Sequence, residues 1–396
     1  MRIFTATCAV VLLALAGCRS PLNTHPVPEW HPIPEPAASD VDAVIFLIGD
    51  AGEATFETSP VLQKRRIDLD DWSQRLGRDS AVALVVLGDN VYPEGMHPKG
   101  HPDFVHDSLV LRGQAELVGG ENARRTGAVG YFIPGNHDWA IRGGAVGEQY
   151  LANQAAMLTA FRNVDGLNVR MVPPAGTGGP GVLDVGRHFR MILFDTAWWL
   201  LTESAPERSA LMIRLEQQLR TRGDRIVMMA AHHPFESGGA HGEGLVPVWK
   251  TLGIKYFLAK SGAVLQNLNS VPFREFRNRM IEIFTRQGPP LIFAGGHEHS
   301  LQVIRDDIPG EPRYTLVAGS ASKLTHVGYV EGQLYRRAAP GYIRLMIRKD
   351  GSVAVFVVAL PEDNQLCNQP DQSVRARCVS EGIAAAKVDY SLELQR

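Results

Sequence analysis

The chain lacks any long block of charge of one sign. Its 396 residues include 40 lysine and arginine side chains and 42 aspartate and glutamate side chains, which gives a formal net charge of −2. Proteins that bind nucleic acids need a concentrated basic surface to neutralise phosphates. Because this sequence offers none, we expect no nucleic-acid binding. With 45% hydrophobic residues, the chain can bury the core of one large α/β domain or of two smaller ones.

Long apolar runs are also missing at the N-terminus. The apolar stretch there covers only residues 9–16, which is too short to cross a membrane as a helix of the mature protein. It follows Arg2 and precedes Gly17 and Cys18, which is the layout of a secretory signal. We therefore predict that residues 1–17 are a signal peptide and that the protein is exported.

Residues 15–18, with the sequence Leu-Ala-Gly-Cys, resemble a bacterial lipobox. The resemblance implies that Cys18 is lipidated and anchors the chain to a membrane; an ordinary signal peptide cut nearby is the alternative. Residues 18–39 carry six prolines, which favour an extended, semi-rigid conformation, so we predict a tether there. Arg19 is compatible with the outer-membrane destination usual for such lipoproteins, and we expect the protein on the periplasmic face of that membrane.

Cysteine is scarce, with four residues in the whole chain. Cys8 would leave with the signal peptide and Cys18 would carry the lipid, so Cys367 and Cys378 are left. Both lie in the polar segment 362–396, which we predict to be a C-terminal tail. An exported compartment permits a disulfide between them. Two free thiols or a metal site are the alternatives, and both are disfavoured because the segment has no histidine to complete a metal site.

Short apolar runs that end in glycine and a polar residue, or in a histidine pair, dominate the rest of the chain. Runs of this length without alternation are typical of strands buried on both faces of an α/β sheet, and the glycine endings favour strands over buried helices. Apolar spacing predicts helices over residues 205–222 and 271–286, and residues 342–358 predict a hairpin. We assign residues 40–361 to one α/β domain. The five apolar runs are residues 44–48, 82–87, 131–133, 226–231 and 291–294.

The residues that follow these runs have the side chains that bind metals. In open α/β sheets, ligands bind outside the carboxyl ends of the strands, which is where each of these clusters falls. Carboxylates, an amide, imidazoles and a phenol together exceed the capacity of one ion, so two adjacent ions sharing a carboxylate are predicted. The residues are Asp50, Asp89, Asn90, Tyr92, Asn136, His137, Asp138, His232, His233, His297 and His299.

Five short motifs in this order resemble those of the calcineurin-like metallophosphoesterases, most closely the purple acid phosphatase branch, which includes the tartrate-resistant enzymes. The resemblance implies a four-layer α/β/β/α sandwich with two metal ions at one end. Although each motif alone is weak, the set spans residues 50–299 in the family's order. The motifs are Gly49-Asp50-Ala51-Gly52, Gly88-Asp89-Asn90-Val91-Tyr92, Gly135-Asn136-His137-Asp138, His232-His233-Pro234 and Gly296-His297-Glu298-His299.

The resemblance also implies a role for each ligand. Asp89 would bridge the two ions, and the phenolate of Tyr92 stands where the purple enzymes supply one, which favours Fe(III) at the first position. Gly52 stands where many relatives have a histidine ligand. The second position would hold Fe(II), Zn(II) or Mn(II). The alternative for Tyr92 is a core aromatic next to Pro93. The first ion would be bound by Asp50, Asp89, Tyr92 and His299, and the second by Asp89, Asn136, His232 and His297.

Two further histidines match substrate-facing positions of the family. His137 and His241 could hydrogen-bond a phosphate oxygen or protonate the leaving alcohol. For His241 a flexible-loop residue is the alternative. Asp138 is expected to orient His137 or to cap the following turn, and His233 is expected to support the site or to face solvent. We expect the three histidines of segment 93–126, namely His97, His101 and His106, to be solvated.

The resemblance implies a phosphomonoesterase that acts on small phosphorylated compounds with a metal-activated hydroxide. No Gly-x-Ser-x-Gly segment is present to supply a serine nucleophile. A phosphodiesterase or nucleotide hydrolase with the same metals is one alternative. A non-catalytic lipoprotein that keeps the fold for binding in the cell envelope is another. Segments 93–126 and 242–290 match no family motif, and we expect them to shape the substrate cleft.

Overall fold

The structure is a computed structural model that describes residues 31–76, 80–242, 266–364 and 366–395. The strands are β1 (Val41–Ile48), β2 (Ala81–Val86), β3 (Val129–Phe132), β4 (Val169–Met171), β5 (Gly181–Val185), β6 (Phe189–Leu193), β7 (Ile226–Ala230), β8 (Ile292–Gly295), β9 (Leu301–Arg305), β10 (Tyr314–Ala318), β11 (Gln333–Arg337), β12 (Gly341–Arg348), β13 (Val353–Ala359) and β14 (Lys387–Leu394). The helices are α1 (Pro60–Arg75), α2 (Phe104–Ala115), α3 (Glu121–Thr126), α4 (Gly144–Val164), α5 (Thr196–Leu201), α6 (Ala205–Arg220), α8 (Val271–Gln287) and α9 (Gln372–Ala385).

The described strands form two sheets of seven strands each. The first has the order β14-β13-β12-β1-β2-β3-β4, and the second has the order β11-β9-β10-β8-β7-β6-β5. In the first sheet β1, β2, β3 and β4 run parallel, and in the second β6, β7, β8 and β10 do so. The outer strands β12, β13 and β14 pair antiparallel. Each sheet therefore gathers several strand carboxyl ends at one edge.

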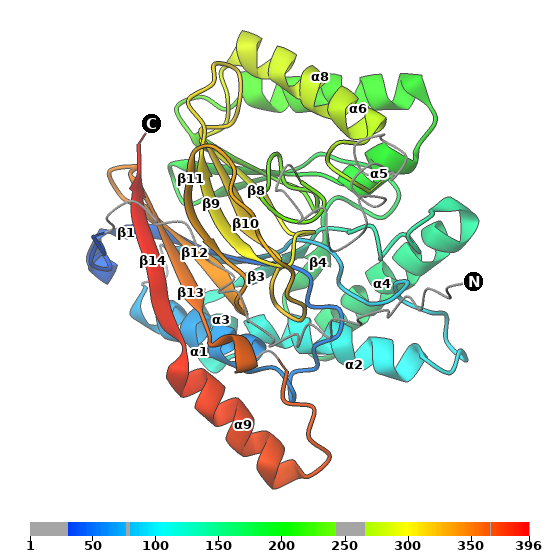
Figure 1. Cartoon of the computed structure of the whole chain (residues 1–396), viewed down its shortest axis with the longest axis vertical. Helices are drawn as coiled ribbons and strands as arrows, with labels where there is room; N and C mark the ends of the chain where they lie inside the picture. Colours follow the sequence, from blue (N-terminus) through cyan, green and yellow to red (C-terminus); the bar gives the residue numbers. More distant parts are fainter. Residues whose placement is uncertain (1–30, 77–79, 243–265, 365, 396) are drawn as a thin grey trace, which may run out of the picture.

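The layers follow from the alternation of side chains along the central strands. On β1, Ala43, Ile45 and Leu47 pack into the core between the two sheets, whereas Val44 and Phe46 pack toward the helices. Helices α1 to α4 cover the outer face of the first sheet, and α5, α6 and α8 cover the second (Figure 1). The protein is a four-layer α/β/β/α sandwich, as predicted. Within the described part of the chain, no helix is both long enough and apolar enough to span a bilayer.

The five predicted strands are present as β1, β2, β3, β7 and β8, with boundaries that differ by one to three residues. The predicted helices correspond to α6 and α8, and the predicted hairpin pairs β12 with β13. Both helices begin where a serine N-cap is followed by a proline in the first turn. Ser204 accepts from the amide of Glu207, and Ser270 accepts from the amide of Phe273.

The prediction of a tail at residues 362–396 is wrong. After α9 the chain returns as β14, which pairs with β13 along its length and forms the edge of the first sheet. Tyr390 and Leu394 are buried in the core between the sheets. The disulfide that the sequence allowed joins Cys367 to Cys378, and the amide of Cys367 donates to the carbonyl of Thr58. The segment is therefore part of the domain.

The predicted tether also ends earlier than residue 39. The amide of Ile33 donates to Ser391 Oγ at 3.0 Å, and Glu35 forms an ion pair with Arg344. These contacts fasten the start of the described chain to β14 and β12. The signal peptide and residues 18–30 of the predicted tether, with Cys18, lie outside the described residues.

Candidate metal centre

The candidate ligands follow the strand ends, and the backbone there adopts an uncommon conformation. Asp50, Asp89 and His297 have positive φ angles of 59°, 53° and 65°, in the left-handed region that non-glycine residues rarely adopt. Such conformations cost about 1 kcal/mol or more each and are concentrated at functional sites. Gly88 has a φ of 89°, and a Cβ there would lie 2.6 Å from His232 Nδ1. A glycine is therefore required where the two sheets approach.

The first group of donors surrounds the hydroxyl of Tyr92. This oxygen lies 3.1 Å from Asp50 Oδ1, 3.0 Å from Asp89 Oδ2 and 3.2 Å from His299 Nε2. His299 Nε2 in turn lies 3.5 Å from Asp50 Oδ1. Tyr92 is 3% exposed, but its hydroxyl faces three polar atoms, so it is more than a core aromatic. Burial, together with the charges of Asp89 and Asp50, raises the pKa of Tyr92 well above its usual value.

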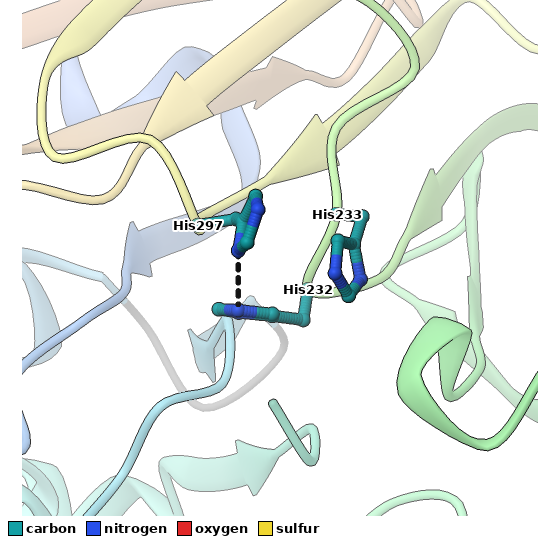
Figure 2. Close-up of side chains that lie close together, drawn as sticks. All are labelled: His232, His233 and His297. Atoms are coloured by element: carbon teal, nitrogen blue, oxygen red, sulfur yellow. Dashed lines mark hydrogen bonds between the residues drawn. The ribbon is translucent and has the colours of Figure 1, made fainter. Parts of the chain in front are cut away.

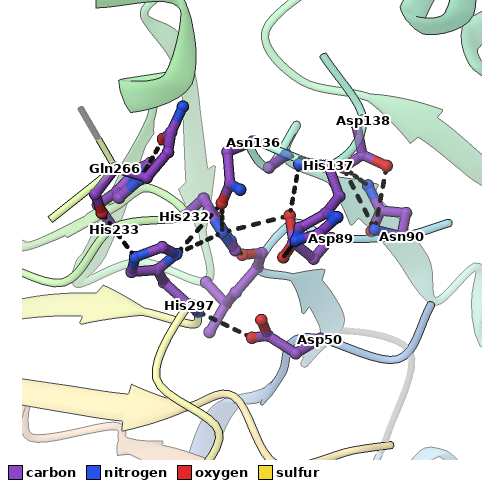
Figure 3. A network of polar contacts seen from close by, with 12 residues as sticks. Asp50, Asp89, Asn90, Asn136, His137, Asp138, His232, His233, Gln266 and His297 are labelled. Atoms are coloured by element: carbon purple, nitrogen blue, oxygen red, sulfur yellow. Dashed lines mark hydrogen bonds and ion pairs between the residues drawn. The ribbon is translucent and has the colours of Figure 1, made fainter. Parts of the chain in front are cut away.

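The second group of donors lies on the other side of Asp89. His232 Nε2 lies 2.9 Å from Asn136 Oδ1, 3.3 Å from Asp89 Oδ1 and 3.2 Å from His297 Nδ1. Figure 2 shows the imidazoles of His232 and His297 meeting from the loops after β7 and β8. Figure 3 shows Asn136 and Asp89 approaching them from the first sheet. Asp89 thus presents Oδ2 to the first group and Oδ1 to the second.

These distances suit metal ions. Donors bound at right angles about 2.1 Å from one ion lie about 3 Å apart, as most of these do. The tautomers also fit, because His232 Nδ1 donates to Leu87 O at 2.8 Å and His297 Nε2 donates to Gln266 O at 2.9 Å. A metal-binding imidazole usually donates its other N–H in this way. Burial, followed by the neighbouring histidines, lowers the pKa of His297 well below its usual value, which favours the neutral form that binds metals.

Gly52 and Tyr92 fit together as a pair. A Cβ at position 52 would lie 2.7 Å from Tyr92 Cδ2 and 2.7 Å from the Tyr92 amide nitrogen. A histidine at position 52 would therefore displace the phenol. The ammonium of Lys323 lies 3.6 Å from the centre of the Tyr92 ring and 2.8 Å from Glu53 Oε1. This contact of Lys323 could not be predicted, since nothing in the sequence around Lys323 indicates a contact with Tyr92.

The two predicted substrate histidines lie beside the donor groups. His137 Nδ1 donates to Pro93 O, which leaves Nε2 free 3.9 Å from Asp89 Oδ2. The ring of His241 lies 4.6 Å from that of His297, centre to centre. Burial alone would lower the pKa of His241, but its contact with Glu298 outweighs this effect and raises it. Glu298 had no predicted role, although its place between two ligands could have drawn attention to it.

Two neighbouring residues support the site without supplying donors. His233 is close to His232 and His297, but its Nδ1 lies 2.8 Å from Thr196 Oγ1 and its Nε2 lies 3.1 Å from Gln266 Oε1. Because both nitrogens have partners and the residue is fully buried, it supports the site and does not face solvent.

Asp138 has a different role from either one predicted. Its carboxylate accepts from the amides of Asn90, Val91 and Gly135, at 3.1, 3.3 and 2.7 Å. These bonds tie the loop after β2 to the loop after β3, as Figure 3 shows for Asn90. Burial and the nearby charge of Asp89 raise the pKa of Asp138 well above its usual value. Its carboxylate therefore contacts these loops rather than the imidazole of His137.

Segment 93–126, in which three solvated histidines were expected, contains α2 and α3. His101 and His106 are exposed as predicted, but the prediction is wrong for His97, which is buried with Nδ1 2.9 Å from Asp107 Oδ2. His97 and His101 stack at 3.9 Å with ring planes 10° apart. Both rings lie near Asp103. An imidazole binds an ion that lies in the plane of its ring. Because the planes of these two stacked rings are almost parallel and do not meet between the rings, the two histidines cannot bind one ion together.

Comparison with known proteins gives similarity in structure alone. No family model matches the chain, and no curated protein matches its sequence. The solved structure described as "GAP50 the anchor in the inner membrane complex of Plasmodium" is 14% identical with a TM-score of 0.52, over 90% of this chain and 89% of that one.

The purple acid phosphatase PPD1 from seeds of yellow lupin, Lupinus luteus, is 13% identical with a TM-score of 0.53. The match covers 89% of this chain and 54% of the lupin chain, so this chain spans about half the length of that enzyme. The protein therefore has the fold seen in a purple acid phosphatase and in an anchor protein.

Proposed function

We propose that the protein is a metal-dependent phosphoric ester hydrolase of the calcineurin-like metallophosphoesterase superfamily. The observation that carries this proposal is the position of Asp89, whose two carboxylate oxygens face two separate groups of metal donors. The similarity of the fold to that of the lupin phosphatase supports it. Fold alone does not fix function, because the same fold occurs in an anchor protein. The donor groups are the stronger argument.

Different residues of this chain would have different roles in hydrolysis. Two cations held here would lower the pKa of a water molecule and neutralise charge on the phosphoryl group. Asp50 and Asp89, both nearly inaccessible to solvent, supply the negative charge that holds them. His137 presents Nε2 beside Asp89, and His241 lies beside His297, so each can donate a hydrogen bond to phosphate or its leaving oxygen.

We propose monoesters as the substrates, because two imidazoles beside two cations suit a terminal phosphate that carries two negative charges. The rates with p-nitrophenyl phosphate and bis(p-nitrophenyl) phosphate compare the two classes directly. We expect a monoester preference of at least about tenfold in kcat/KM. A preference for the diester would favour the phosphodiesterase or nucleotide hydrolase alternative.

We propose Fe(III) at the position of Asp50, Asp89, Tyr92 and His299, because a phenolate is a hard anionic donor. Fe(II), Zn(II) or Mn(II) would then occupy the second position. A violet absorption band in the purified protein, lost in Tyr92→Phe, is the expected result. A fully metal-loaded, active and colourless protein would instead support a zinc or manganese enzyme.

The Asp89→Asn variant tests the function as a whole. Losing the shared carboxylate should lower the metal content and reduce kcat/KM for p-nitrophenyl phosphate by about 1,000-fold or more. The matched control is Glu311→Gln. Glu311 is a carboxylate that forms an ion pair with Arg277, and it lies in the loop before β10, outside the candidate site. Unchanged metal content and turnover in Asp89→Asn would show that the site is wrongly assigned. Metal binding without turnover on any ester would favour a binding role.

We also propose that the protein is an exported lipoprotein anchored through Cys18. The disulfide between Cys367 and Cys378 supports export, because such bonds persist in oxidising compartments. Mass spectrometry of the mature N-terminus should find a lipid on Cys18, and Cys18→Ser should release the protein from membranes. An unmodified mature N-terminus at another residue would support an ordinary signal peptide.

A further inference from the structure

Glu298 is a fully buried acid between two candidate ligands, His297 and His299. Its Oε1 accepts from the amide of His241 at 2.8 Å. The loop that carries His241 packs closely on this carboxylate, since a Cβ at Gly239 would lie 2.1 Å from Oε2. A buried carboxylate is costly unless it is paired, so each of its contacts matters.

Two buried atoms in this contact lack a hydrogen bond, and they face each other. Glu298 Oε2 and His241 Nδ1 are both without a hydrogen-bond partner among the described residues, and they lie 3.6 Å apart. The carboxylate oxygen of Glu298 can only accept a hydrogen bond, and His241 Nδ1 can donate one when it carries a hydrogen. A small rotation of either side chain would form a charge-assisted hydrogen bond.

The backbone of the loop is held by other residues. Gln302 Oε1 accepts from the amide of Gly238 at 2.9 Å, and Gln302 Nε2 donates to Ser237 Oγ at 2.8 Å. The carbonyl of His241 accepts from the amide of Leu268 at 2.9 Å. These bonds fix the path of the loop but leave the orientation of the imidazole open. Glu298 is placed to set that orientation.

We propose that Glu298 is a positioning residue that accepts the Nδ1–H of His241 and so directs Nε2 toward the second donor group. The proposal rests on the proposed function for its consequence. As the ester bond to phosphorus breaks, the leaving oxygen keeps the electron pair and takes the Nε2 proton of the imidazolium form of His241, which becomes the neutral Nδ1–H form and later regains a proton from solvent. A water oxygen forms the new bond to phosphorus and releases its proton to solvent, while Glu298 stays ionised.

The Glu298→Gln variant tests this role by kinetics. An amide in place of the carboxylate would present its NH2 group to Nδ1 and could not accept the Nδ1–H, so the imidazole would lose its orientation and kcat for an alkyl phosphate should fall roughly 10- to 100-fold. The fall should be less than about threefold for p-nitrophenyl phosphate, because its leaving group needs little protonation. The KM and the metal content should stay within about twofold. Glu311→Gln, which alters a carboxylate away from the site, is the control.

A double-mutant cycle separates positioning from a general structural effect. In a His241→Asn background, Glu298→Gln should change kcat by less than about twofold, because its effect passes through the imidazole. An equal loss in both backgrounds, or a loss of metal in Glu298→Gln, would overturn the proposal.

A measurement without turnover separates this proposal from the proposed function. Nitrogen-15 spectra of the histidines, recorded with zinc added, should show a proton on Nδ1 of His241 in the wild type and no proton on that nitrogen in Glu298→Gln. His241→Asn identifies the signal. If the protein hydrolyses no ester but shows this change, the positioning role stands and the proposed function fails. If Nδ1 of the wild-type residue carries no proton, the positioning role is wrong.

Discussion

The candidate ligands with positive φ angles take part in hydrogen bonds that fix the backbone of the site. The amide of His297 donates to Asp50 Oδ2 at 2.8 Å, and the amide of His137 donates to Asp89 Oδ1 at 3.0 Å. Each carboxylate therefore fixes the backbone of another site residue with one oxygen. Asp50 keeps Oδ1 for the first donor group, which shows how one aspartate serves both the local backbone and the site.

Arg65 is a buried cation outside the site. It is fully buried in α1, and none of its side-chain nitrogens has a hydrogen bond among the described residues. Its guanidinium carbon lies 3.5 Å from the centre of the Phe46 ring. Burial is the main reason that the pKa of Arg65 falls to about 9. The attraction to the ring offsets only part of the cost of burying this charge.

We predict that Arg65→Met stabilises the protein. A methionine of similar length would fill the space without a buried charge, so the free energy of unfolding should rise by about 1–3 kcal/mol. Urea denaturation measures the change. The control is Arg66→Met, because Arg66 is partly exposed and donates to Gly119 O, and its loss should cost up to about 1 kcal/mol. A less stable Arg65→Met would mean that the cation contributes more than its burial costs.

At the scale of elements, the cap of α5 predicts a pH dependence. Asp195 is the N-cap residue of α5, accepting from Trp198 N at 2.9 Å and from Trp139 Nε1 at 2.8 Å. Burial raises the pKa of Asp195 from its ordinary value of 3.8 to about 7. Between these two values the folded protein binds a proton that the unfolded chain has lost. The stability from this proton is complete below about pH 4 and is lost as the pH rises through about 7.

The Asp195→Asn variant should remove this dependence. From pH 5 to pH 8, the wild type should lose on the order of 2–3 kcal/mol of unfolding free energy relative to the variant. Denaturation curves at several pH values in chelator measure the difference. A wild-type protein whose stability changed with pH in parallel with the variant would rule out Asp195 as the source.

The disulfide should stabilise the edge of the first sheet. The two cysteines are eleven residues apart, and their bond joins the segment before α9 to α9 itself, while the amide of Cys367 donates to the carbonyl of Thr58. Closing a loop of this length contributes about 3 kcal/mol, so the Cys367→Ser, Cys378→Ser double variant should be less stable by about that amount. Hydrogen exchange should rise first in β14. Reduced wild type serves as the control and should behave like the variant; an unchanged protein would show that the bond adds nothing.

At the scale of the whole molecule, the sequence predicted the central parts better than the edges. Strands buried on both faces consist of continuous apolar residues, so β1, β2, β7 and β8 were recognisable. The edge strand β14 alternates polar and apolar residues and was taken for part of a tail. Such a strand depends on its partner β13, which lies elsewhere in the sequence.

The candidate donors were predicted for a similar reason. Each follows a glycine or a strand end, and the topology brings these ends together, so motif order was enough to name them. Contacts that depend on side-chain packing could not be predicted. His97 is buried against Asp107, and Glu298 is buried against the loop that carries His241. Neither contact can be predicted from the order of residues in the sequence.

The most direct measurement is anomalous X-ray scattering from crystals grown with manganese or zinc. We predict two peaks about 3.5–4 Å apart, one on each side of the Asp89 carboxylate. Two peaks would fit because Asp89 Oδ2 faces Tyr92 and Asp89 Oδ1 faces His232. A single peak, or peaks only elsewhere such as beside His97 and His101, would contradict a centre for two ions.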